Sequence, residues 1–387
     1  MSIETRFIEP LDVLFLRGNK LFGDPGSHGE SLVPPWPSVA AGALRSRILA
    51  DDGIDLTAFA AGKIPHATLG TPAVPGSFTV TAFHLARRFA DGRVEALIAP
   101  PADLVVSEDT HGVPSINALS PVQTVTGLMA STPFAALPVL AETSRGKPAS
   151  GYWLTETGWR AYLAGKLPAP GDLVKSSDLW KIDPRVGVGL DADTRRAADG
   201  RLFSVQAVAM TQRQHGTQDS FDVGFVAAVS GASLPQDGTV RLGGDGRAAA
   251  IHPVTTTLPE PDYAAIAAAR RCRIVLATPG IFAGGWLPTG FAQADNGSTR
   301  FDFAGVKARL VCAAVPRFET VSGWDLARWQ PKPAQRAAPA GSVYWLDQLD
   351  ATPDALRKLA AAGLWCTPCE DAARRAEGFN RITLAAY

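Results

Sequence analysis

The segment from residue 10 to 49 constrains the fold most, because it predicts a strand, a long loop and a helix in a fixed order. The apolar run Val13–Leu16 predicts the strand. A proline-rich stretch at 34–37 ends the loop and precedes a helix. We expect this helix to be capped by Ser38 and to end near Ala50, with alanine and leucine on one face.

The loop between this strand and helix is cationic and rich in glycine. It follows Arg17 directly and holds Lys20, His28 and Ser31, together with four glycines counting Gly18. Small residues let backbone N–H groups approach phosphates, and basic side chains neutralise them. The loop is therefore suited to an extended polyanion.

Charge balance requires that any nucleic-acid surface be local. Lys+Arg and Asp+Glu are both 37, so the net charge is zero. Residues 270–336, however, contain ten basic and four acidic residues, which leaves a net charge of +6. Guanidinium groups bind phosphate in a bidentate manner. An RNA or DNA surface and an ordinary solvated surface both fit this segment.

The chain has the features of a cytoplasmic protein with no membrane partner. Its four cysteines do not form a disulfide framework, which indicates a reducing compartment. Glu4 and Glu9 lie where a signal peptide would have basic and then apolar residues. No apolar stretch reaches the roughly 18 residues that a bilayer span requires.

The predicted elements indicate an α+β protein with two domains. Strands are predicted from alternating or β-branched runs at Phe7–Ile8, Phe78–Leu85, Tyr152–Leu154, Leu202–Met210, Phe221–Val229, Arg273–Ala277, Arg309–Ala313 and Val343–Leu346. Thr352 begins a second helix, which Gly363 ends. A Thr-, Pro- and acid-containing stretch at 253–261 predicts domains 1–255 and 262–387. Residues 107–140 have no clean period, which suggests an inserted hairpin or partner-binding arm.

Several motifs have both a functional and an ordinary interpretation. His28 could act as a general base, or it could be a loop histidine bonded to backbone or RNA. Arg195 and Arg196 could lie in an RNA-contacting loop or in a simple turn, and we interpret 243–247 as a tight hairpin turn. Trp324, Trp329, Tyr344 and Trp345 could stack on bases or lie in a core or subunit interface.

Neither a cofactor nor a metal is expected. Cys366 and Cys369 form a single CxxC, whereas a structural zinc needs two further ligands. Residues 183–191, DPRVGVGLD, lack the strand-to-helix context of a dinucleotide fingerprint. The chain is predicted to bind its ligands without such groups.

Four stretches together are similar to the third subunit of the type III-B CRISPR effector, the Cmr complex, within the RAMP superfamily. They are EPLDVLFLRG at 9–18, SLVPPWPSVAAGALRS at 31–46, DPRVGVGLD at 183–191, and SGWDL with the following WQPKPAQRAAPAGSVYW up to 345. They occur in the expected order from end to end of the chain. As a set they are specific, although no single one would be.

The resemblance implies two ferredoxin-like (RRM-like) RAMP domains with β-hairpin and loop insertions, and no enzymatic activity. It implies a subunit that holds the repeat-derived 5′ tag of the CRISPR RNA. Such a subunit docks the large polymerase-like subunit and the backbone RAMP subunits, and meets target RNA only indirectly. Family members also carry a hairpin wedge, for which residues 107–140 are our candidate. The alternative is a metal-independent endoribonuclease that processes CRISPR RNA with His28 as acid/base.

On this basis we expect a set of RNA-binding residues. They are Arg17, Lys20, His28, Ser31 and Arg45, with Arg195, Arg196, Lys332, Arg336 and Phe379 as weaker candidates. The chain departs from the family's C-terminal glycine-rich loop, because Asn380 follows Gly378-Phe379 where a glycine is expected. Asparagine tolerates positive φ, so we expect the turn to survive.

Overall fold

The computed structural model describes residues 3–18, 28–123, 134, 136–142, 146–213, 220–256, 258–294 and 298–387. Its contacts divide the chain into two interleaved units. Unit 1 consists of residues 1–95, 177–256 and 320–335, and unit 2 of residues 96–176, 257–319 and 336–387. The chain passes from unit 1 to unit 2 after Thr256, near the predicted boundary, but it also does so after Glu95, and residues 320–335 return to unit 1. The predicted division into domains 1–255 and 262–387 stays a prediction.

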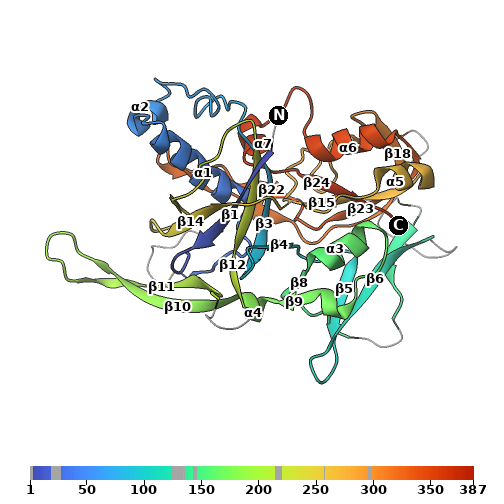
Figure 1. The fold of residues 1–387 in the computed structure, drawn as a ribbon, viewed down its shortest axis with the longest axis horizontal. Coiled ribbons are helices and arrows are strands. Elements are labelled where there is room, and N and C mark those ends of the chain that lie inside the picture. Colours follow the sequence, from blue (N-terminus) through green and yellow to red (C-terminus); the bar gives the residue numbers. More distant parts are fainter. Residues whose placement is uncertain are drawn as a thin grey trace. The chain divides into compact units, whose positions relative to one another are not determined.

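Unit 1 is built on a six-stranded sheet in the order β13-β14-β1-β12-β3-β4 (Figure 1). These strands are β1 (Ile3–Pro10), β3 (Thr79–Phe89), β4 (Val94–Leu97), β12 (Phe221–Ser230), β13 (Thr239–Arg241) and β14 (Ala248–Pro253). β1 lies between β12 and β14 and runs antiparallel to both. β12 also pairs antiparallel with β3.

Helix α1 (Pro37–Asp51) contacts β3 and β13 of this sheet and buries Ala40, Leu44 and Ile48 among other residues. The predicted cap at Ser38 is wrong by two residues, because Trp36 takes the N-cap position without a side-chain bond. Pro37 fixes the first helical φ, so Ser38 falls inside the first turn.

A long hairpin extends from the same unit, and we call it the arm (Figure 1). It consists of β10 (Trp180–Leu190) and β11 (Ala197–Met210), paired antiparallel. The short strand β2 (His28–Gly29) pairs parallel with β11. The predicted strand Leu202–Met210 is confirmed as part of β11. Strand β10 was not predicted, because sequence analysis did not assign the motif at 183–191 to a strand.

Unit 2 has its own six-stranded sheet, in the order β16-β17-β18-β23-β15-β24. These strands are β15 (Cys272–Leu276), β16 (Phe291–Gln293), β17 (Thr299–Phe303), β18 (Val306–Ala314), β23 (Val343–Asp350) and β24 (Ile382–Ala385). β15 lies between β23 and β24, antiparallel to both, and β23 pairs antiparallel with β18.

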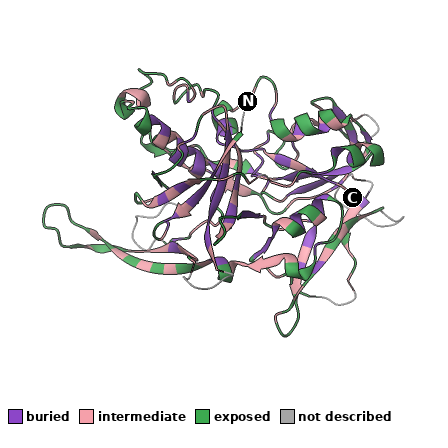
Figure 2. Cartoon of the chain, in the orientation of Figure 1, coloured by how far each residue is buried: buried purple, intermediate pink, exposed green. Residues whose placement is uncertain are grey.

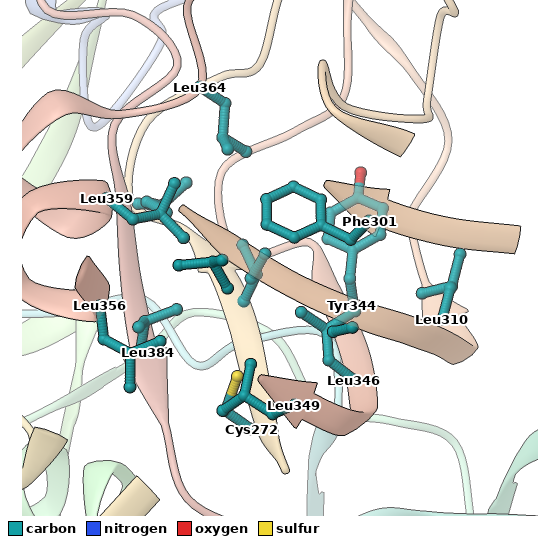
Figure 3. Packing of buried hydrophobic residues seen from close by; sticks show 14 of the residues in the cluster. Cys272, Phe301, Leu310, Tyr344, Leu346, Leu349, Leu356, Leu359, Leu364 and Leu384 are labelled. Atoms are coloured by element: carbon teal, nitrogen blue, oxygen red, sulfur yellow. The ribbon is translucent and has the colours of Figure 1, made fainter. Parts of the chain in front are cut away.

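Helix α6 (Pro353–Ala362) follows β23 and packs Leu356 and Leu359 into the core of unit 2 (Figure 3). The predicted cap is confirmed, since the Thr352 side chain accepts a hydrogen bond from the Ala355 N–H and Gly363 ends the helix. Tyr344 joins the same core and Trp345 a neighbouring one, so both are core residues.

The described part of the region 107–140, where we expect an inserted hairpin or partner-binding arm, forms antiparallel strands, which agrees with a hairpin. β5 (Leu104–Glu108), β6 (Pro114–Gln123) and β7 (Ala136–Leu140) form a three-stranded sheet. Val106 and Ile116 of this sheet belong to a core cluster of unit 2. The sheet is therefore anchored by packing.

The remaining elements are short. They are α2 (Leu56–Ala60), β8 (Tyr152–Leu154), α3 (Glu156–Leu163), the 3₁₀ turn Pro170–Asp172, β9 (Leu173–Lys175), α4 (Ser176–Leu179), α5 (Tyr263–Ala269), β19 (Glu319–Val321), β20 (Trp324–Asp325), β21 (Gln330–Pro331), β22 (Gln335–Ala337) and α7 (Ala372–Ala376). Among the described residues, no helix is both long and apolar enough to cross a membrane.

Candidate nucleic-acid interface

The two ends of the predicted cationic loop meet at the base of the arm. Leu14 and Val208 of β11 exchange backbone hydrogen bonds, each of 2.8 Å. At the other end of the loop, the Leu32 N–H donates to the Leu16 carbonyl at 2.7 Å. The prediction of a strand at 13–16 is wrong, because Leu14 forms only an isolated bridge, to Val208 of the arm, and the next bridge joins Arg17 to Ser31.

Ser31 and His28 are fixed to β11 by side-chain hydrogen bonds. The Ser31 hydroxyl donates to the Gln206 carbonyl at 2.7 Å, and the Ser31 N–H donates to Gln206 Oε1 at 3.1 Å. His28 Nδ1 lies 2.7 Å from Ser204 Oγ. His28 remains exposed, whereas Ser31 is half-buried. The loop thus leaves its histidine at the surface beside the arm.

Arg17 lies against the turn between β13 and β14. Its Nη2 is 3.0 Å from Asp245 Oδ1, and the two side chains are 43% and 50% exposed. The Gly244 N–H donates to the Phe15 carbonyl at 2.8 Å. The turn prediction at 243–247 is confirmed, since the Leu242 N–H donates to the Arg247 carbonyl.

Two further arginines gather around the buried ring of Phe15. The Arg247 guanidinium lies 5.2 Å from the ring centroid and that of Arg185 lies 5.9 Å from it. Arg185 comes from β10, and Arg247 comes from the end of the β13–β14 turn. Sequence reasoning missed both, although each belonged to a motif that it had noted.

We call Arg17, His28, Ser31, Arg185 and Arg247 the arm-base surface. Each of its arginines has a carboxylate within hydrogen-bonding distance: Asp245 at 3.0 Å, Asp183 at 2.9 Å and Asp12 at 2.5 Å. All three carboxylates are 43% exposed or more. Exposed ion pairs contribute little stability, so a phosphate can replace the carboxylate at small cost.

The tip of the arm carries Arg195 and Arg196, both exposed (Figure 2). The Asp191 side chain accepts hydrogen bonds from the N–H and hydroxyl of Thr194 and from the Asp193 N–H. These bonds lower the pKa of Asp191 below its ordinary value, with the Thr194 N–H as the largest cause. Arg195 takes a φ of 53° in this turn. The tip is thus an ordered turn that holds two cations at the end of the arm.

The other predicted residues have contacts of their own. Arg45 lies on α1 with its guanidinium 4.9 Å from the Phe78 ring centroid. Lys332 closes a small hairpin by donating its N–H to the Gly323 carbonyl at 2.8 Å. Arg336 belongs to unit 2 and lies 4.9 Å from the ring centroid of Phe318. Lys20 lies outside the described residues.

Phe379 is enclosed in unit 2. Its side chain has 0% exposure, and its carbonyl accepts a hydrogen bond from Trp365 Nε1 at 2.8 Å. The ring therefore has no surface to offer to a base. Asn380 takes a φ of 58°, as the sequence predicted, and its side-chain amide bonds to Ile281 and Leu364.

Part of the positive charge in segment 270–336 is used inside unit 2. Arg273 is buried and contacts Asp103 at 2.6 Å. Arg309 Nε donates to Asp347 Oδ1 at 2.8 Å. The net charge of this segment therefore overstates the positive surface that it presents. Among the described residues, no group of three or more His, Cys, Asp or Glu could hold a metal ion.

The chain matches a model of the family described as CRISPR-associated protein (Cas_Cmr3) over residues 6–385. It is also similar to a chain of "Cryo-EM structure of the Type III-B Cmr-beta bound to cognate target RNA and AMPPnP, state 1". That match has 13% identity and a TM-score of 0.42, and covers 92% of this chain and 88% of that chain. A chain of "Cryo-EM structure of the Type III-B Cmr-beta bound to cognate target RNA" is similar as well. That match has 15% identity and a TM-score of 0.42, and covers 88% of this chain and 86% of that chain. No curated protein matches the chain.

Proposed function

The chain belongs to the CRISPR-associated Cmr3 family, and from that premise we propose that it is a non-catalytic subunit of the type III-B effector that binds the 5′ tag of the CRISPR RNA at the arm-base surface. Arg17, Arg185 and Arg247 would neutralise phosphates, while His28 and Ser31 would bond to tag nucleotides. The docking of the large polymerase-like subunit and of backbone subunits belongs to the same proposal.

One observation carries this proposal. Three separate parts of the chain bring arginines to the Phe15 ring and the β13–β14 turn: Arg185 of β10 and Arg247 lie near the ring, and Arg17 contacts Asp245 of that turn. Each guanidinium contacts an exposed carboxylate, which a phosphate can displace. Phosphate contacts position a nucleic acid without reading its sequence.

The strand orders support two ferredoxin-like RAMP domains. In a ferredoxin-like βαββαβ unit, the fourth and third strands flank the first, and the second lies beyond the third. The orders β14-β1-β12-β3 in unit 1 and β24-β15-β23-β18 in unit 2 both follow this pattern. Among the described residues, α1 follows the first strand of unit 1 and α6 follows the third strand of unit 2.

The arm is a better candidate than residues 107–140 for the hairpin wedge that the family resemblance implies. The β5-β6-β7 sheet packs into a core cluster. The arm, in contrast, consists mostly of exposed and half-buried residues (Figure 2), and apolar residues are among the exposed ones. Val188 and Leu202 pair directly across the two strands and are 44% and 60% exposed. Apolar wedges of this kind enter between bases and separate them.

The decisive measurement is RNA binding as a function of salt. We expect Arg17→Ala to weaken binding of tag RNA and to reduce the slope of log K against log salt by about 0.7, the value for one phosphate contact on a single strand. Arg160→Ala is the matched control, because Arg160 is 61% exposed on α3 of unit 2. Equal affinity and slope in the two variants would remove the arm-base surface from consideration.

The endoribonuclease alternative is tested in the same preparation. Among the described residues, the side chain that contacts His28 Nδ1 is the hydroxyl of Ser204 and not a carboxylate. This geometry favours a binding histidine over an acid/base that a charged group orients. Cleavage of repeat RNA in EDTA, abolished by His28→Ala, would establish the enzyme instead.

A further inference from the structure

A small hairpin in unit 1, residues 322–332, carries two tryptophans that the arm-base surface does not use. Trp324 is 45% exposed and Trp329 is 74% exposed, so neither is a core residue. Their rings meet edge to face, with centroids 5.9 Å apart and planes at 87°. Leu326, between them in sequence, is 65% exposed.

The backbone holds this hairpin in one conformation. Asp325 Oδ1 accepts the N–H groups of Ala327 and Arg328 at 3.0 and 3.1 Å, which closes the turn. At the base, the Ser322 hydroxyl donates to the Lys332 carbonyl at 2.9 Å. The tryptophans are therefore presented on a bonded framework and do not lie on an unsupported loop.

Trp329 also has an unusual backbone conformation. Its φ is 52°, in the left-handed region that bulky side chains rarely adopt. Such strain persists where the surrounding structure imposes it, and it concentrates at functional sites. Here it accompanies a large ring that gains little from burial, so neither packing nor local preference accounts for a tryptophan at this position.

We propose that the Trp324–Trp329 hairpin is a stacking platform for an unpaired base of single-stranded RNA. This inference rests on the proposed RNA-binding function. Charge favours RNA over a basic or purely apolar protein surface: residues 320–335 contain Arg328 and Lys332 against one acid, Asp325, whose carboxylate already accepts two N–H groups of the turn. Exposed aromatic rings beside cations are the usual arrangement for binding a base together with its phosphate.

The test is the affinity of the full-length protein for a 12-nucleotide oligouridylate probe. Stacking on one ring predicts binding about 5- to 150-fold weaker for Trp329→Ala. Trp329→Phe should retain most of the affinity. Trp329→Gly should lose as much as Trp329→Ala while relieving the positive φ, so a folding defect cannot account for its loss.

Leu326→Ala is the matched control on the same hairpin. Because an aliphatic side chain does not stack, its removal should leave the affinity unchanged. Two results would overturn the inference: unaltered affinity in both Trp329→Ala and Trp329→Gly, or equal losses in Leu326→Ala and Trp329→Ala. Loss of co-purifying protein subunits, with RNA affinity unaltered, would make the hairpin a protein contact instead.

The same probe separates this inference from the proposed function. If Arg17→Ala weakens binding and the Trp329 variants do not, the arm-base surface stands and the stacking platform is rejected. If the Trp329 variants weaken binding and Arg17→Ala does not, the RNA site lies at the hairpin and the arm-base proposal fails.

Discussion

Removing the Asp103 carboxylate from the core of unit 2 should destabilise the protein strongly. Asp103 is 0% exposed, and its Oδ2 lies 2.6 Å from Arg273 Nη1. Its Oδ1 accepts the Tyr162 hydroxyl at 2.9 Å. Arg273 also donates to the carbonyls of Tyr162 and Ala386 at 3.0 and 2.7 Å, and lies over the Tyr162 ring.

The magnitude follows from what Asp103→Ala leaves behind. A buried charge that loses its partner costs about 3–5 kcal/mol of unfolding free energy. Arg273 keeps two backbone acceptors, so we expect the lower half of that range, about 3–4 kcal/mol. Arg273→Met removes the other charge, and the double variant should cost less than the sum of the singles by about 2 kcal/mol or more.

Urea unfolding measured by tryptophan fluorescence provides the assay. Trp159 stacks on Tyr162 with centroids 5.3 Å apart, so its emission reports on this cluster. Asp302→Ala is the control, because Asp302 and Lys307 form an ion pair with both side chains more than 60% exposed. We expect the control to lose less than about 1 kcal/mol. The reasoning would be refuted if Asp103→Ala lost no more unfolding free energy than the Asp302→Ala control. It would also be refuted if the losses of Asp103→Ala and Arg273→Met added up to the loss of the double variant.

Three further substitutions test local features of both units. Gly187→Val should disorder the arm, because a Cβ at this position would collide with the Phe203 ring; faster hydrogen exchange along β10 is the measurement, and unchanged exchange would contradict it. Gly42→Ala on α1 should raise the unfolding free energy by about 0.5–1 kcal/mol, since its Cβ would meet open space; a loss of stability in urea would count against the packing of α1. Asn380→Ala should lower the unfolding free energy by about 2–4 kcal/mol, because three side-chain hydrogen bonds are lost. A loss below about 1 kcal/mol in urea unfolding would show that these bonds are not formed.

Local signals allowed correct predictions where the determinants are local. The α6 boundaries follow from Thr352 and Gly363, because a cap acts on its own helix and needs no distant partner. The turn at 243–247 was predicted for the same reason. Positive φ at Asn380 was also predictable, since asparagine tolerates the left-handed region.

The candidate site was only partly predictable, because it is assembled by tertiary contacts. The turn prediction gave no indication that Arg247 would reach the ring of Phe15. Strand β10 was missed because Gly187 and Gly189 weaken the strand pattern, although they leave room for Phe203 and Arg201 on the neighbouring strand. Sequence likewise could not show that Arg273 is buried.

Crosslinking of photoreactive tag RNA to the intact ribonucleoprotein, followed by peptide mapping, tests the central claim most directly. We predict crosslinks to residues 12–17, 28–32 and 203–208, which converge at the base of the arm. Crosslinks confined to peptides outside the arm and its base, with none in these three segments, would contradict the account.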